Sequence, residues 1–379
     1  MSFLDDRPRI VTRSNPCLRD SAGFKPFMEY AGSYALFNYR LKDPAKGLEY
    51  DNLQLIRAFE AGLDPSSSEA GFVLVHIAMV KESGALVKGA ADMLDSCAGR
   101  DRERFNDGLR TLVGGLSKVN AVMNSEYTLV YCCAMTNLST AMWKRSKPNG
   151  YTSFRTFIFG ITSQSMFPNG VIYEGVSEEP LSFRGESGAN DSMIPMCDNL
   201  LQVAMPETPL TDILKDFRQY RPGNHREFLE AVRDSAEQSG VREFATGDSV
   251  SAALYLQALD QVRDFRWRHW CFTREYILKH TSHPTATGGS PIVTASLPGI
   301  YSKLCRLTLI SGSQTSSRLC LRRWPRHLST ASRSMASTTS WRLQTRNARR
   351  CERRWKSIVA NGVSQRPETG LSRTALDGQ

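Results

Sequence analysis

A single histidine on a long apolar helical stripe is the feature that most constrains the fold of this chain. Seven residues recur at spacings of three or four: Leu254, Ala258, Val262, Phe265, His269, Phe272 and Tyr276. This period predicts one face of an α-helix that is apolar except at His269. A buried imidazole needs a partner for each ring nitrogen, because burial without hydrogen bonds costs free energy. Two interpretations stay open: a metal ligand whose second nitrogen is held by an acceptor, or a core histidine satisfied by a main-chain carbonyl.

The composition of the chain is that of a folded protein without obvious targeting segments. Its 379 residues are 41% apolar, which allows one large domain or two smaller ones. No apolar run approaches the length of a membrane span, and the N-terminus lacks the apolar core of a secretory signal. The nine cysteines form no CxxC pair. We therefore expect a cytoplasmic protein in a reducing compartment, with no membrane attachment.

The net charge of +10 comes from the C-terminal tail. Residues 295–379 contain 16 of the 48 Lys and Arg but only 3 of the 38 Asp and Glu, so they carry +13 and the rest of the chain carries −3. Arginines and tryptophans in this tail could bind the phosphates and bases of a nucleic acid. Two alternatives are a disordered extension without a role and a translated sequence that was never selected to fold, such as a retained intron or a shifted frame, and the abrupt change of composition after Thr294 favours the latter. We expect no nucleic-acid partner.

The periodicity of the remaining chain predicts an all-α fold. The segments with helical patterns are 27–41, 51–61, 71–94, 102–133, 211–220 and a long helix from 249 onward. One of Ser66, Ser67 and Ser68 is expected to cap the third of these helices, and Asp248 or Ser249 the last. Gly114 and Gly115 could break the fourth helix. Strand-like alternation is scarce, and residues 182–192 are expected to form a flexible loop.

Two further features are candidates for ligand binding. In YTSFRTFIFG, Arg155 lies among aromatic residues, where a guanidinium either pairs with a ligand carboxylate or forms an internal bridge to a Glu. In HPTATGGSP, residues 283–291, a Thr-Gly-Gly-Ser turn offers main-chain N–H groups and hydroxyls to an anion. Such a turn is also common without any ligand.

The order of several segments along the chain resembles a known family. YAGSYALFNYRLKDPAKGLEYDNL is followed by GFVLVHIAMV, SFRTFIFGI, GVIYEGV and FRGESGANDS, and then by FRQYRPGNHREFL, RWRHWCFTREYIL and TATGGS. Over residues 27–294 this series is similar to indoleamine 2,3-dioxygenases, in particular to fungal members. The resemblance implies an all-α fold with a small N-terminal domain and a large helical domain that holds haem b. It also implies oxidation of L-tryptophan by O2 to N-formylkynurenine, the first step of the kynurenine pathway.

The resemblance assigns roles to individual residues around the haem. His269 precedes the segment Thr273–Leu278 and matches the proximal ligand of the iron. Phe72 matches the distal phenylalanine over the haem, and His76 a distal position that holds Ser or His in the family. Arg155 matches the arginine that pairs with the substrate carboxylate. His76 could then polarise bound O2 or orient the substrate amine.

Two loops and two tyrosines near the indole pocket complete the resemblance. The first loop lies beside the haem edge, where Glu186 replaces a small residue; the second closes over the substrate. The residues matched are Ser187 and Gly188 in the first loop, Thr287, Gly288 and Gly289 in the second, and Tyr30 and Tyr34 near the indole pocket.

The chain departs from the family pattern at both ends. We expect residues 1–26 to be a remnant of the small N-terminal domain or a linker, residues 27–294 to be the large haem domain, and residues 295–379 to replace a leucine-rich helix of the family. The leading prediction is a monomeric, haem-dependent tryptophan dioxygenase that uses O2. The alternatives are a non-catalytic haem or O2-binding protein of the same fold, and an inactive product of an imperfect gene model.

Overall fold

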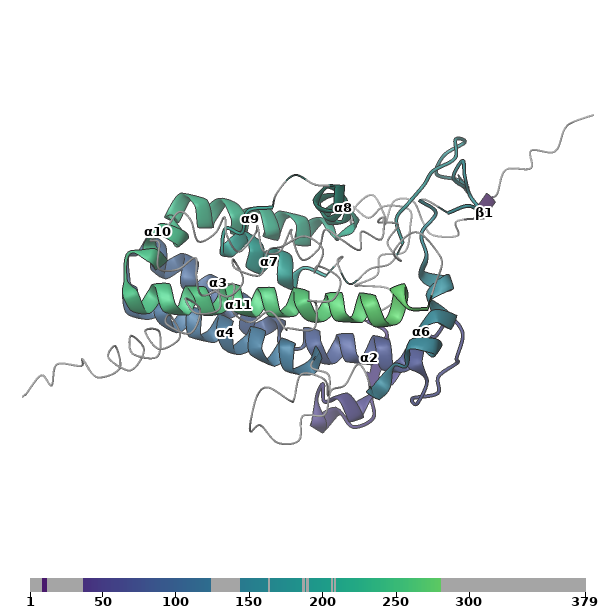
Figure 1. Cartoon of the computed structure of the whole chain (residues 1–379), viewed down its shortest axis with the longest axis horizontal. Coiled ribbons are helices and arrows are strands. Elements are labelled where there is room, and N and C mark those ends of the chain that lie inside the picture. The colour runs from purple at the N-terminus through teal and green to yellow at the C-terminus, as the bar shows by residue number, and fades with distance from the viewer. Residues whose placement is uncertain are drawn as a thin grey trace, which may run out of the picture. The chain divides into compact units, whose positions relative to one another are not determined.

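The computed structural model describes residues 9–11, 37–123, 144–162, 164–185, 188, 191–205, 207 and 209–280, all in the first of two units of the chain, Met1–Leu304. The described part of this unit is built mainly from helices, which confirms the predicted all-α class (Figure 1). The α-helices are α2 (Ser68–Val80), α3 (Ser83–Ala98), α4 (Arg102–Met123), α6 (Pro148–Arg155), α7 (Met193–Leu200), α8 (Pro209–Phe217), α9 (Gly223–Ser239), α10 (Val241–Thr246) and α11 (Ser249–Phe272). The strands are β1 (Arg9–Val11), β2 (Tyr39–Leu41), β3 (Leu53–Leu55) and β4 (Ile172–Glu174).

The long helix α11 runs through the middle of the bundle, with α4 along one side of it and α7 and α9 on the other in the view of Figure 1. Apolar residues of α3, α4, α7, α9, α10 and α11 form one core cluster. A second cluster joins α2, β3, α6 and the π-helical turn Thr273–Leu278, which continues α11. Phe272 packs against both clusters. The C-terminal end of α11 therefore lies where the two cores meet.

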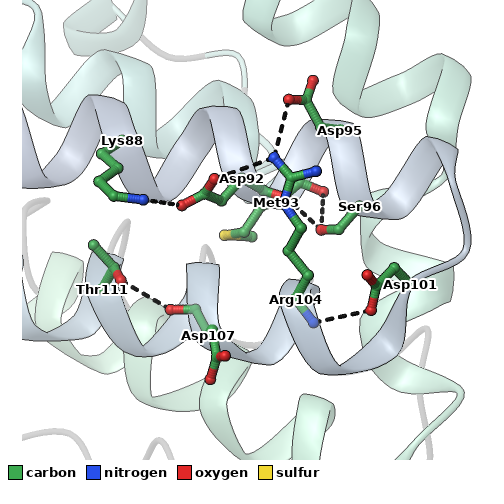
Figure 2. Close-up of polar contacts among 9 residues, drawn as sticks. All are labelled: Lys88, Asp92, Met93, Asp95, Ser96, Asp101, Arg104, Asp107 and Thr111. Carbon is green, nitrogen blue, oxygen red and sulfur yellow. Dashed lines mark hydrogen bonds and ion pairs between the residues drawn. The ribbon is translucent and has the colours of Figure 1, made fainter.

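Helices α3 and α4 form a tight antiparallel hairpin. Arg100 adopts a positive φ of 56° at the turn between them. A Cβ atom on Gly89 of α3 would lie 2.9 Å from the carbonyl oxygen of Gly108 in α4, so the two backbones approach closely. Figure 2 shows Arg104 of α4 reaching across to Asp92 and Asp95 of α3, at 3.3 and 3.4 Å. These ion pairs are exposed and add little to stability; the close packing determines the hairpin.

Helix boundaries follow the predicted caps. The Ser67 hydroxyl accepts from the Ala70 N–H at 3.1 Å, and the Asp248 carboxylate accepts from Val250 and Ser251 at 3.0 and 2.8 Å. The predicted helix 211–220 is present as α8 and the 3-10 turn Arg218–Tyr220. These confirmed boundaries depend on short-range hydrogen bonds, which a sequence displays directly.

Three helix predictions were wrong in part. Residues 39–41 are strand β2, which pairs antiparallel with β3, and the segment 51–61 is a 3-10 turn, β3 and a loop. That loop is held by the buried Glu69 carboxylate, which accepts from the N–H groups of Phe59, Glu60 and Ala61 at 2.6, 3.1 and 3.2 Å. The segment 71–94 is divided between α2 and α3, whereas α4 runs through Gly114 and Gly115 without a break.

The segment Ser68–Ala98, which spans α2 and α3, is long and apolar enough by composition to cross a membrane. Half of its most apolar window is buried inside the fold. The core helices of soluble proteins pass the same test, so this single segment is weak support for a membrane span.

Candidate functional site

The predicted stripe on α11 is confirmed, and His269 lies at its C-terminal end. Ala258 and Val262 are buried, and Phe265 and Phe272 pack against the core. His269 itself is exposed to solvent, although the protein around its ring lowers the pKa of the imidazole. The ring is therefore close to protein atoms on several sides and still accessible. Among the described residues no main-chain carbonyl hydrogen-bonds to this ring, which weakens the interpretation of a satisfied core histidine.

The end of α11 is fixed by two arginines that shortly precede His269, Arg266 and Arg268. Arg266 pairs with the buried Asp198 of α7 at 2.5 Å. Arg268 reaches Asp264 at 3.5 Å and the side-chain oxygen of Asn120 in α4 at 3.3 Å. After His269 the helix widens into the π-helical turn Thr273–Leu278, a distortion often found at functional sites. Neighbouring helices therefore determine the direction in which the His269 side chain points.

His76 of α2 is the second imidazole of the site. Its Nδ1 lies 2.9 Å from the carbonyl oxygen of Phe72, and a carbonyl only accepts, so Nδ1 carries the proton. The pKa of His76 is lowered to about 4, mainly by burial and to a lesser extent by the neighbouring His269, against the opposing effect of the hydrogen bond to Phe72. His76 is therefore neutral at pH 7, with the lone pair on Nε2. Two neutral imidazoles on different helices thus lie near enough to interact electrostatically.

An aromatic cluster connects the helices of the two histidines. The Phe72 ring lies 4.7 Å from that of His76, 5.2 Å from Tyr151 and 5.5 Å from Phe154. Tyr151 in turn lies 5.5 Å from Tyr276 in the π-helical turn. These tilted and edge-on contacts make a rigid apolar wall suited to a flat ligand.

Arg155, the last residue of α6, is only 3% exposed. Its guanidinium carbon lies 4.6 Å from the centre of the Phe159 ring, and a hydrogen bond with Tyr151 supports the charged form. Burial lowers the pKa of the guanidinium, but an arginine remains charged at pH 7. A buried positive charge is thus linked through Tyr151 to the aromatic cluster beside His76.

Gly188 brings the predicted loop to the distal histidine. A Cβ atom on Gly188 would lie 3.4 Å from His76 Nε2, so the Gly188 main chain faces this nitrogen. The start of the loop is held against Gly160, where a Cβ atom would lie 2.0 Å from the Gly185 nitrogen. The other loop and pocket predictions lie outside the described residues: Tyr30, Tyr34, Ser187, Thr287, Gly288 and Gly289.

The sequence patterns missed three polar or aromatic residues of this region. Tyr151 stands in an aromatic run, and only the fold shows that it joins Phe72 to Arg155. Asp198 stands in the apolar segment MIPMCDNLL, where a lone acidic residue could have indicated a buried ion pair. Arg221 directly follows the predicted helix 211–220 and no pattern singled it out, yet it is 1% exposed.

The fold and the site define an all-α protein with two neutral imidazoles and an aromatic wall at the junction of two cores. Imidazole nitrogens are ligands for haem iron, and the donors present fit that group. The chain belongs to the indoleamine 2,3-dioxygenase family, whose model matches residues 14–296.

Three relatives show what the chain is similar to. Indoleamine 2,3-dioxygenase 2 of Homo sapiens is 24% identical over 71% of this chain and 60% of its own length. An indoleamine 2,3-dioxygenase of Penicillium citrinum is 26% identical over 56% of this chain and 46% of its own length. A myoglobin of Haliotis madaka is 30% identical over 31% of this chain and 32% of its own length. The chain therefore spans less than two thirds of these relatives.

Proposed function

We propose that this protein is a haem-dependent dioxygenase that opens the indole C2–C3 bond of L-tryptophan with O2 and gives N-formylkynurenine. The observation that carries the proposal is the pair of neutral imidazoles, His76 and His269, beside the aromatic cluster and the buried Arg155. The family membership supports the same reaction class.

His269 is the residue that would hold the iron, because its ring is neutral, accessible and fixed by the packing of α11. Haem, when bound, would supply the iron that activates O2. The other described residues then bind and orient the substrate. Phe72 and its aromatic neighbours pack against the indole, and Arg155 pairs with the carboxylate of the amino acid.

The tautomer of His76 restricts its role. With the proton on Nδ1, Nε2 accepts a hydrogen bond and does not donate one. Of the two roles expected from the sequence, polarising bound O2 needs a donor, whereas orienting the substrate through its ammonium or indole N–H needs an acceptor. We therefore propose that His76 orients the substrate.

The test begins with the visible spectrum of the purified protein after haemin addition, with and without L-tryptophan. Tryptophan-dependent oxygen uptake and formation of N-formylkynurenine are then measured on the same sample. His269→Ala should abolish stable haem binding, and His280→Ala, an exposed histidine eleven residues further on, should not. Full histidine-ligated haem in His269→Ala would contradict the assignment.

The similarity to the Haliotis protein favours a second candidate, reversible O2 binding without turnover. In that case the haem-loaded protein should bind O2 and release it unchanged, and L-tryptophan should not increase oxygen consumption.

A further inference from the structure

Asp191 is a fixed junction between the Gly188 loop and the helical bundle. Its N–H donates to the Gly188 carbonyl at 3.1 Å, and its carboxylate accepts from the Met193 N–H at 2.7 Å, at the start of α7. Its own carbonyl accepts from Nη2 of Arg221 at 2.9 Å. These three hydrogen bonds leave this residue little freedom.

Arg221 supplies the bond that comes from outside the loop. It lies between the 3-10 turn Arg218–Tyr220 and α9, and it is 1% exposed. Burying a guanidinium costs free energy unless specific contacts compensate for it. The hydroxyl oxygen of the next residue of the loop, Ser192, lies 3.2 Å from Nδ1 of His225 in α9. The side of the loop that leads into α7 is therefore attached to α9 and the turn that precedes it.

This attachment leads directly to His76. The Gly188 carbonyl is bonded to Asp191, and the main chain of Gly188 faces His76 Nε2 at contact distance. A displacement of Asp191 would move Gly188 toward the imidazole or away from it. Among the residues that the structure describes, the path from Arg221 to the imidazole leads through Asp191 and Gly188.

We infer that Arg221 is a positioning residue: through the Asp191 carbonyl it holds Gly188 against His76 and thereby determines where His76 Nε2 lies. Only the measurement on the haem-bound protein rests on the proposed function. In this role Arg221 acts through the main-chain groups of Asp191 and Gly188.

The experiment compares Arg221→Met, which removes the hydrogen-bond donor, with Arg221→Lys, which keeps the charge on a shorter side chain. Arg242→Met is the matched control. Arg242 also donates to a main-chain carbonyl, that of Gln202. It belongs to α10, which lies at the end of the bundle away from α2 and α6 (Figure 1). The readout is the CO stretching band of the ferrous CO complex, which reports the groups beside the bound ligand. Arg221→Met should shift or split this band, Arg221→Lys should do so less, and Arg242→Met should leave it as in the parent.

The decisive comparison is made in a His76→Ser background. There Arg221→Met should cause no further change in the band, since the imidazole through which it acts is gone. An unchanged band in Arg221→Met, or the same change with and without His76, would overturn the inference.

A haem-free readout keeps the inference separate from the proposed function. The ring-nitrogen NMR shifts of His76 in the apoprotein should differ between the parent and Arg221→Lys, and should be the same in the parent and Arg242→Met. If haem fails to bind, the proposed function is wrong, and these shifts still decide on Arg221: identical shifts in the parent and Arg221→Lys would refute its role.

Discussion

Removing the Arg155 guanidinium should weaken L-tryptophan binding without loss of haem. The structure places this charge at 3% exposure, against Phe159 and Tyr151, where a ligand carboxylate would be largely desolvated. Removing one partner of such a pair costs about 2–5 kcal/mol. Since about 1.4 kcal/mol corresponds to a factor of ten, Arg155→Met should raise the tryptophan dissociation constant by roughly 30-fold to several thousand-fold.

The assay titrates haem-loaded protein with L-tryptophan and with tryptamine, which lacks the carboxylate. The parent should prefer L-tryptophan, and Arg155→Met should lose most of this preference while tryptamine affinity changes little. Arg155→Lys should recover only part of it, because an ammonium cannot form the planar two-point contact of a guanidinium. Haem content and CO binding should stay close to those of the parent in both variants.

A purely structural role for Arg155 gives a different result. The contacts with Phe159 and Tyr151 would then stabilise the end of α6, and their loss would lower haem retention and the free energy of unfolding together. If affinities for L-tryptophan and tryptamine fall by the same factor in Arg155→Met, the substrate-anchor role is refuted.

Three further substitutions test the packing that holds the site. Asp198→Ala leaves the half-buried Arg266 without its carboxylate and should lower the free energy of unfolding by about 3–5 kcal/mol. The loss should be smaller in the double variant with Arg266→Met; urea unfolding measures both. Glu69→Gln turns one of the acceptor oxygens into a donor facing main-chain N–H groups and should destabilise by roughly 2–4 kcal/mol, whereas the exposed Glu103→Gln should be neutral. Gly71→Ala would place Cβ 1.9 Å from the Arg145 carbonyl oxygen and should separate α2 from that segment, seen as a lower melting temperature and weaker haem retention; an unchanged melting temperature would contradict this packing.

The sequence revealed those parts of the site that depend on local periodicity. The stripe that carries His269 repeats every three or four residues, and Phe72 and His76 lie one helical turn apart, so both patterns are visible within a short window. The residue types of the caps at Ser67 and Asp248 were equally visible, because a cap bonds to residues two or three positions away.

The remaining parts depend on contacts between distant positions. Arg266 and Asp198 are 68 residues apart, and Arg221 and Asp191 are 30 apart. Periodicity along one chain contains no signal for such pairs. The short strands β2 and β3 were missed for a related reason: a three-residue strand is defined by its partner, here by the pairing of Tyr39 with Leu55, rather than by its own composition.

The low pKa of His76 predicts how the stability of the apoprotein depends on pH. In the unfolded chain this imidazole titrates near 6.5, and in the folded protein near 4, because burial opposes the charged form and His269 adds to the effect. Below pH 6.5 the unfolded state binds a proton that the folded state does not, so the free energy of unfolding falls as pH falls. Above pH 6.5 this effect is absent, and by pH 4 it has lowered the free energy of unfolding by about 3 kcal/mol. His76→Gln removes this group and leaves His269 and His225 in place, so urea unfolding of the parent between pH 7.5 and 4 should show a steeper loss than the variant. If the free energies of unfolding of the two proteins fall in parallel as the pH falls, the folded imidazole titrates like a solvated one. The assignment of a neutral His76 with its lone pair on Nε2 would then be wrong.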